Sequence, residues 1–153
     1  MQIRIQIQNE DFDLSQELAL VDASAPDCGA VVSFIGKVRG HDNPQQPLSH
    51  LYLTHMPEVT EHEISKIIAQ AAERWSLPYV CVIHRVGKLP VGAQIVLVLT
   101  ASGHREHAYQ ANHFIMDYLK TEAPFWKKEY FANGQQHWVE MKHSDQQRTQ
   151  SWQ

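Results

Sequence analysis

Three lysines lie close to a predicted bend in the last third of the chain. Lys120 is near the end of a helix predicted over residues 106–122, and Lys127 and Lys128 come shortly after Pro124. Proline disfavours helical geometry in the residue before it, so we expect the chain to turn there and to bring Lys127 back toward Lys120. Ammonium groups can hold an anion, and a deprotonated lysine is also a nucleophile. Lysine at a helix end is equally typical of a solvated surface, because cations suit the negative end of the helix dipole.

Four further basic side chains lie next to predicted ends of strands and helices. Lys37 and Arg39 follow an apolar strand, and His104 and Arg105 immediately precede the helix that carries Lys120. The free amide groups at a helix start attract anions, and arginine offers a planar fork for two oxygen contacts. The combined pattern predicts a binding site for a phosphate or a carboxylate. For each residue taken alone, separate placement on the surface is the competing interpretation.

Hydrophobic periodicity predicts a mixed α+β domain that holds these residues in place. We expect strands at residues 2–8, 29–36, 51–55, 80–86 and 94–100, two strands around Asn133-Gly134, and helices at 14–20, 60–75 and 106–122. In the last helix, Lys120 lies on the flank opposite four residues that should face the core: Ala108, Ala111, Ile115 and Leu119.

Local signals predict how these elements begin and connect. Asp13 is the expected N-cap of the first helix, and Thr60 with Glu63 is the expected capping box of the second. Residues 41–47 are a polar loop, and residues 87–92 a hairpin-like connection between two strands. The polar tail from about residue 145 is expected to be loosely ordered.

Length and composition limit the classes of protein that the chain can form. At 153 residues and without an internal linker, residues 1–153 are expected to fold as a single domain. A formal charge of −4 and a pI near 6.2 argue against a broad basic face for nucleic acid. No apolar run is long enough to cross a bilayer, and residues 2–8 alternate unlike a secretory signal, so we expect a cytoplasmic protein. Cys28 and Cys81 are too isolated for a disulfide framework or a zinc site and are expected to be buried thiols.

Motifs for several common enzyme classes are missing from the sequence. Its ten histidines form no His-Glu-x-x-His or comparable ligand set, so neither a metal nor another cofactor is expected. The sequence has no Gly-x-Ser-x-Gly nucleophile elbow and no Walker-type glycine loop. Hydrolase and nucleoside-triphosphatase functions therefore have no support from motifs.

A set of longer segments resembles the large, catalytic subunit of molybdopterin synthase. The segments are GAVVSFIGKVR at 29–39, IHRVG at 83–87, HR at 104–105, FIMDYLKTEAPFWKK at 114–128, WVE at 138–140 and SDQQ at 144–147. They occur in the same order from residue 29 to the C-terminus. The resemblance implies an α/β hammerhead fold with an additional small antiparallel sheet, and a homodimer within a heterotetramer. It also implies a small ubiquitin-like sulfur-carrier subunit at each outer end.

The resemblance further implies a reaction and a set of site residues. Two sulfurs move from the thiocarboxylated C-termini of carrier subunits to cyclic pyranopterin monophosphate, giving the dithiolene of molybdopterin. The substrate-binding positions of the family match Lys37, Val38, Arg39, His104, Arg105, Lys120, Lys127, Lys128 and Glu129. The two catalytic lysines match Lys120 and Lys127, while His104 and Arg105 would come from the neighbouring subunit.

Two other classes of function use the same cationic residues. One is a non-catalytic module that binds a phosphate ligand or a protein without sulfur transfer, and the other is an enzyme that forms a Schiff base on Lys120. Purified protein that binds cyclic pyranopterin monophosphate but does not convert it would indicate the non-catalytic module. The aromatic residues Phe125, Trp126, Tyr130 and Trp138 could stack on a pterin, but packing within the fold is the expected role.

Overall fold

The computed structural model describes residues 1–40, 44–139 and 143–153, so the first three residues of the predicted loop at 41–47 and Glu140 lie outside the described part. The elements are β1 (Gln2–Gln8), α1 (Leu14–Ser24), β2 (Ala30–Lys37), β3 (Leu48–His55), α2 (Val59–Arg74), β4 (Tyr79–Arg85), β5 (Gly87–Pro90), β6 (Gln94–Ser102), α3 (Arg105–Glu122), β7 (Phe125–Phe131), β8 (Gln136–Trp138) and α4 (His143–Gln150). The predicted α+β class, including an additional small antiparallel sheet, is confirmed.

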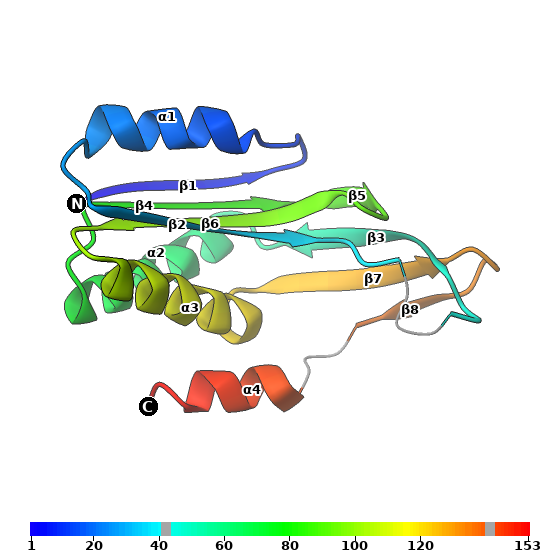
Figure 1. Ribbon diagram of the computed structural model, residues 1–153. Coiled ribbons are helices and arrows are strands. Elements are labelled where there is room, and N and C mark those ends of the chain that lie inside the picture. Colours follow the sequence, from blue (N-terminus) through cyan, green and yellow to red (C-terminus); the bar gives the residue numbers. More distant parts are fainter. Residues whose placement is uncertain (41–43, 140–142) are drawn as a thin grey trace.

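The first sheet has the strand order β1-β4-β6-β2 and forms the centre of the molecule. β1 runs parallel to β4, whereas β4 with β6 and β6 with β2 are antiparallel. Figure 1 shows α1 on one face of this sheet and α2 and α3 on the other. The two middle strands are buried along nearly their whole length because helices cover both faces, which explains their continuous apolar sequences.

The second sheet, β5-β3-β7-β8, is antiparallel throughout and lies beside the first. The prediction of a hairpin-like connection at 87–92 is only partly right, because residues 87–90 form strand β5, which pairs with β3. Gly87 has a φ of +87°, a conformation that glycine adopts without strain, and it directs the chain from one sheet to the other. β4 and β6 still pair with each other, so the connection spans both sheets.

Helix α2 begins earlier than its predicted capping box. Glu58 is the N-cap, and the side chain of Glu61 accepts a hydrogen bond from the Glu58 backbone N–H at 2.8 Å. Thr60 instead lies buried in the first turn, where its hydroxyl accepts from the Met56 N–H at 3.0 Å and donates to the Pro124 carbonyl at 3.1 Å. The Thr60–Glu63 prediction was wrong because this hydroxyl forms a long-range contact that the local sequence does not reveal.

Two hydrophobic clusters fill the space on either side of the first sheet. The larger cluster joins β4 and β6 to α2, α3 and the second sheet, with fully buried side chains such as Leu53, Ile64 and Phe114. The smaller one lies under α1 and includes Val21 and Leu97. The Asp13 side chain accepts from the backbone N–H groups of the first turn of α1, so the predicted N-cap is confirmed.

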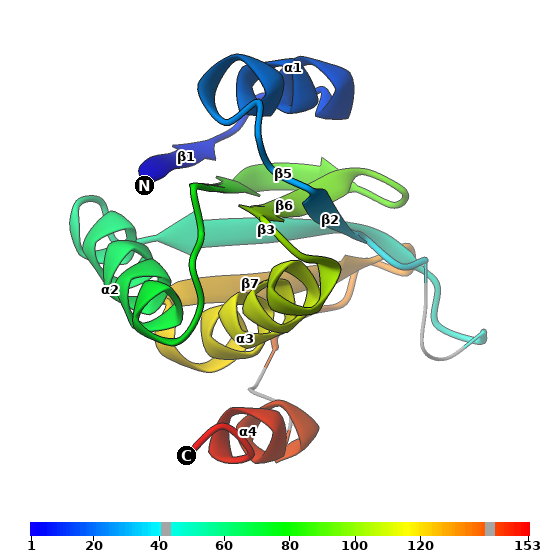
Figure 2. The same cartoon turned by 60° about the vertical axis from the view of Figure 1, so that its left-hand side comes forward.

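The C-terminal segment differs from the loosely ordered tail that its composition predicted. Residues 143–150 form α4, which packs below α3 in both views (Figures 1 and 2). Trp152 holds it in place: its indole N–H donates to Asp117 at 2.7 Å, and its ring meets those of Trp75 and Phe114 edge-on. Together with the Thr149 hydroxyl, which donates to the Asp117 carbonyl at 3.1 Å, this partly buried aromatic side chain compensates for a polar helix, which composition alone cannot show.

Replacement of Trp152 by alanine should release α4 from α3. We expect amide hydrogen exchange in α4 to become about tenfold faster, because the partly buried hydrogen bond to Asp117 and the aromatic packing are lost. Trp152→Phe, which keeps an aromatic ring but not the N–H, should have a smaller effect. Trp138→Ala, at a tryptophan that is 58% exposed on β8, is the control and should leave α4 unchanged. Equal exchange in wild type and Trp152→Ala would show that Trp152 does not hold the helix.

Candidate active site

A cavity of about 560 Å³ lies where both sheets meet the C-terminal end of α3. Of the nine site residues predicted from the sequence, six line it: Lys37, Val38, Arg39, Lys120, Lys127 and Glu129. They come from three separate parts of the chain. The tertiary structure therefore gathers most of the predicted cationic groups around one space.

Helix α3 places Lys120 at the cavity. Its residues Ala108, Ala111 and Ile115 are fully buried against the first sheet, as the helical register predicts. Lys120 is on the exposed flank and lines the cavity together with Met116. Because its apolar face anchors the helix on the sheet, α3 directs Lys120 toward the cavity.

The bend after α3 brings Lys127 to the same cavity. Ala123 has an extended backbone (φ −79°, ψ 128°), and the Thr60 hydroxyl holds the carbonyl of Pro124. In β7, side chains alternate between the two faces, so Phe125, Lys127 and Glu129 share the side that lines the cavity. The predicted return of Lys127 toward Lys120 is thus present in the structure.

Three residues that pair across neighbouring strands of the first sheet line another wall of the cavity. His84 of β4 and Gly36 of β2 both pair with Val96 of β6, and all three line the cavity. A Cβ at Gly36 would lie 2.8 Å from Cγ1 of Val96, so glycine leaves the space open. After a register shift at Gly36/Lys37, Val38 is buried and its N–H donates to the Ala93 carbonyl at 2.9 Å. Val38 thereby anchors the chain between Lys37 and Arg39.

An aspartate and two histidines to which the sequence analysis assigned no role also line the cavity. Asp145 reaches it from α4, and His137 of β8 lies 3.4 Å from Glu129. His84, from β4, is the third of these side chains. A histidine inside the apolar strand predicted at 80–86 could have marked His84 as a candidate site residue from the sequence. The positions of Asp145 and His137 depend instead on how the C-terminal segment packs.

Three predicted site residues do not line this cavity. His104 is the N-cap of α3 and Arg105 its first residue, both exposed. They are separated from Lys120 by nearly the whole helix, about 22 Å at 1.5 Å per residue. Lys128 points to the other side of β7, where its ammonium nitrogen lies 5.5 Å and 5.3 Å from the ring centres of Tyr130 and Trp138.

The aromatic residues near the bend divide between the two faces of β7. Phe125 packs inward and stacks on the ring of His84, as expected for a packing role. Tyr130 stacks on His50. Trp126 and Trp138 are instead 46% and 58% exposed, so the packing prediction is wrong for these two in the single chain. Strand alternation explains the contrast between Phe125 and Trp126, because neighbouring residues of β7 point to opposite faces.

Burial keeps His84 neutral. Loss of solvent lowers its pKa from 6.5 to about 3; the hydrogen bond to the Arg85 carbonyl opposes this, and the nearby charges of Lys127 and Lys120 add to it. The Nδ1 atom lies 2.9 Å from that carbonyl, which can only accept, so Nδ1 carries the proton. The cavity thus combines several cations with one buried neutral imidazole.

Comparison with known proteins shows the family of the chain. The family model described as MoaE protein matches residues 7–122. The chain belongs to the MoaE protein family. It is 48% identical to the molybdopterin synthase catalytic subunit of Mesorhizobium japonicum, over 97% of this chain and 92% of the relative, and 46% identical to that of Pasteurella multocida, over 98% of each. The molybdopterin biosynthesis MoaE protein from Burkholderia ambifaria superposes with a TM-score of 0.84 at 41% identity, covering 99% and 98% of the two chains. The family resemblance expected from the sequence is confirmed.

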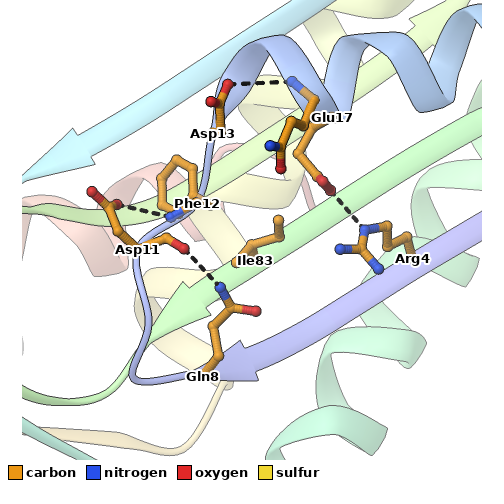
Figure 3. A pocket seen from close by; sticks show the side chains of 8 residues that line it. Arg4, Gln8, Asp11, Phe12, Asp13, Glu17 and Ile83 are labelled. Atoms are coloured by element: carbon orange, nitrogen blue, oxygen red, sulfur yellow. Dashed lines mark hydrogen bonds and ion pairs between the residues drawn. The ribbon is translucent and has the colours of Figure 1, made fainter.

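A second hollow, of about 380 Å³, lies between β1 and α1 and contains none of the predicted site residues. Figure 3 shows Arg4 and Glu17 meeting across it, with 2.6 Å between Nε and Oε1. The thiol of Cys81 lies beside Glu17, and burial raises its pKa to about 12, so the expected buried thiol is confirmed there. Cys28 is only partly buried. This ion pair of the MoaE-family chain fixes α1 on the first sheet.

The described part of the chain was also searched for metal ligands and membrane spans. Within residues 1–40, 44–139 and 143–153, His, Cys, Asp and Glu side chains form no group of three or more that could hold a metal ion. None of the helices described is both long and apolar enough to cross a membrane.

The neutral state of His84 predicts a pH dependence of stability. Above its unfolded-state pKa of 6.5 the group is neutral in both states, and as the pH falls toward about 3 only the unfolded state gains the proton. Stability should therefore decrease by about 1.4 kcal/mol per pH unit below pH 6.5 from this group. Denaturant unfolding at pH 7 and pH 5 measures it. His84→Phe should remove this part of the pH dependence, and an unchanged slope would mean that His84 is protonated in the fold.

Proposed function

We propose that the protein is the catalytic subunit of a molybdopterin synthase. It transfers sulfur from the thiocarboxylated C-terminus of a small carrier subunit to cyclic pyranopterin monophosphate. The observation that carries this proposal is the meeting of Lys120 and Lys127 in one cavity with Lys37 and Arg39. Membership of the MoaE protein family and relatives described as catalytic subunits support it.

The charge of the cavity suits the two reactants. A phosphate-bearing pterin and a thiocarboxylate are both anionic, so their approach costs repulsion unless cations lie between them. Lys37 and Arg39 stand on one wall and the two lysines on the others. Glu129 and Asp145 reduce the mutual repulsion of these cations when the cavity is empty.

The thiocarboxylate sulfur is already a nucleophile, so the protein has to orient it and to move protons. We assign proton transfer to Lys120, on the exposed flank at the end of α3. Lys127, held in strand β7, polarises the reacting centre and stabilises negative charge on oxygen. Neither role needs a metal.

His104 and Arg105 take part through a second copy of the chain. Along α3 they lie about 22 Å from Lys120, too far to reach the cavity of their own subunit. Both are exposed at the helix start, where free amide groups also favour an anion. In a two-fold dimer the same residues can complete the neighbouring cavity, so each site would use two chains.

The first test is single-turnover conversion of cyclic pyranopterin monophosphate by the protein with thiocarboxylated carrier. Lys120→Ala should slow conversion by about 10²- to 10⁴-fold, the range for loss of a general acid or base. Lys127→Ala should cost about 10²- to 10³-fold, as for loss of an electrostatic stabiliser. Lys66→Ala, at a side chain 55% exposed on α2, is the matched control. Near-normal rates in a cavity variant would remove that lysine from the mechanism, and binding without conversion by wild type would indicate a non-catalytic module.

Mixed dimers test whether two chains build one site. Arg105→Ala and Lys120→Ala proteins are each expected to be strongly impaired on their own. After subunit exchange, a mixed dimer contains one cavity with an intact Lys120 from one chain and an intact Arg105 from the other. Activity should therefore return on mixing. If both residues acted within one chain, no mixed dimer would have an intact site and activity would stay low.

A further inference from the structure

His84 is the one fully desolvated imidazole among the described side chains that line the cavity. It is 7% exposed and stands beside Val96 and Gly36 on the first sheet. Its ring stacks on Phe125 with 3.8 Å between centroids and 17° between planes. The proposed sulfur transfer gives it no task. Placement at the end of a run of buried strand residues, at such a cost in solvation, indicates a specific use of its polar atoms.

The hydrogen bonding of His84 fixes which ring nitrogen is available. Nδ1 carries the proton and donates to the Arg85 carbonyl at 2.9 Å. In a neutral ring the other nitrogen, Nε2, then has a lone pair and no proton. His84 therefore presents a hydrogen-bond acceptor in a cavity whose other nitrogen groups are mainly donors.

A neutral acceptor cannot bind the anionic part of a ligand. The Nε2 lone pair repels phosphate and carboxylate oxygens, and binding them would require an imidazolium. Burial and the nearby Lys127, Lys120 and His55 all oppose that charge, which places the pKa of His84 near 3. The phosphate must consequently be held by the cationic residues, and His84 must face an uncharged donor group.

We propose that His84 is a specificity-determining residue: its Nε2 accepts a hydrogen bond from a ring N–H or amino group of the substrate heterocycle. This inference rests on the proposed function and names how the same cavity recognises the uncharged half of the precursor. A ligand without such a donor leaves Nε2 unpaired in a desolvated place, which costs binding free energy.

The remaining lining of the cavity fits a planar ring next to a phosphate. Phe34, Met116 and Leu119 add apolar surface to that of Phe125, while the lysines and Arg39 supply charge. The stack with Phe125 limits rotation of the imidazole, so the direction of Nε2 is preset. One cavity thereby offers an anion site, an apolar surface and a fixed acceptor.

The experiment compares binding of cyclic pyranopterin monophosphate and of inorganic phosphate by the full chain with its carrier subunit. His84→Phe keeps an aromatic ring that can stack on Phe125 but has no acceptor, and His84→Gln restores an acceptor atom at a similar reach. His50→Phe is the control, because this histidine also stacks on an aromatic ring, at 4.5 Å from Tyr130, but does not line the cavity. Thermal unfolding of every variant is recorded.

We expect His84→Phe to weaken precursor binding by about tenfold, the equivalent of one hydrogen bond. The affinity for inorganic phosphate should stay as in wild type, and His84→Gln should recover most of the precursor affinity. In turnover, KM should rise while kcat changes little, since the same contact is present before and during the reaction. His50→Phe should match wild type in all these measurements.

Other outcomes would overturn the proposal. Equal loss of phosphate and precursor affinity would indicate a general collapse of the cavity. A lower kcat with unchanged precursor affinity would indicate that Nε2 acts on Lys127 rather than on the substrate. Wild-type conversion with unchanged binding by His84→Phe would refute this inference and leave the proposed function standing, whereas binding differences without any conversion by wild type would refute the proposed function alone.

Discussion

The turn between α3 and β7 holds the cavity together. α3 is fixed by its apolar face on the first sheet, and β7 by its pairing with β3 in the second. Between them, Pro124 ends the helix and the Thr60 hydroxyl of α2 holds its carbonyl. With both flanking elements anchored, Lys120 and Lys127 cannot separate, although their positive charges repel each other.

That repulsion is the energetic cost of the site, and the surrounding residues reduce it. Glu129 lies two residues beyond Lys127 on the same face of β7, and Asp145 is brought in by α4. The C-terminal helix therefore belongs to the site as well as to the fold, although nearly all of its own residues are polar. A bound anion would offset the repulsion among the cations further, so an empty cavity of this kind favours anionic ligands.

Sequence patterns identified elements where the cause of structure is local. Alternating isoleucines gave β1, the Asp13 cap gave the start of α1, and Asn133-Gly134 gave the turn between β7 and β8, where Gly134 has a φ of +89°. They were wrong or incomplete where a distant partner decides the outcome. β5 pairs with β3, a strand distant in the sequence, and the Thr60 hydroxyl donates to the distant Pro124 carbonyl instead of forming the predicted cap.

The sequence by itself determined the α+β class, the helical register that turns Lys120 away from the core, and the bend that returns Lys127. These follow from periodicity and from the fixed geometry of proline, which act over a few residues. Only the tertiary structure decided that Lys37 and Arg39 share the cavity with Lys120 and Lys127, and that His84 is a neutral acceptor there. Solvation and pairing across sheets set these features, and both depend on residues far apart in the chain.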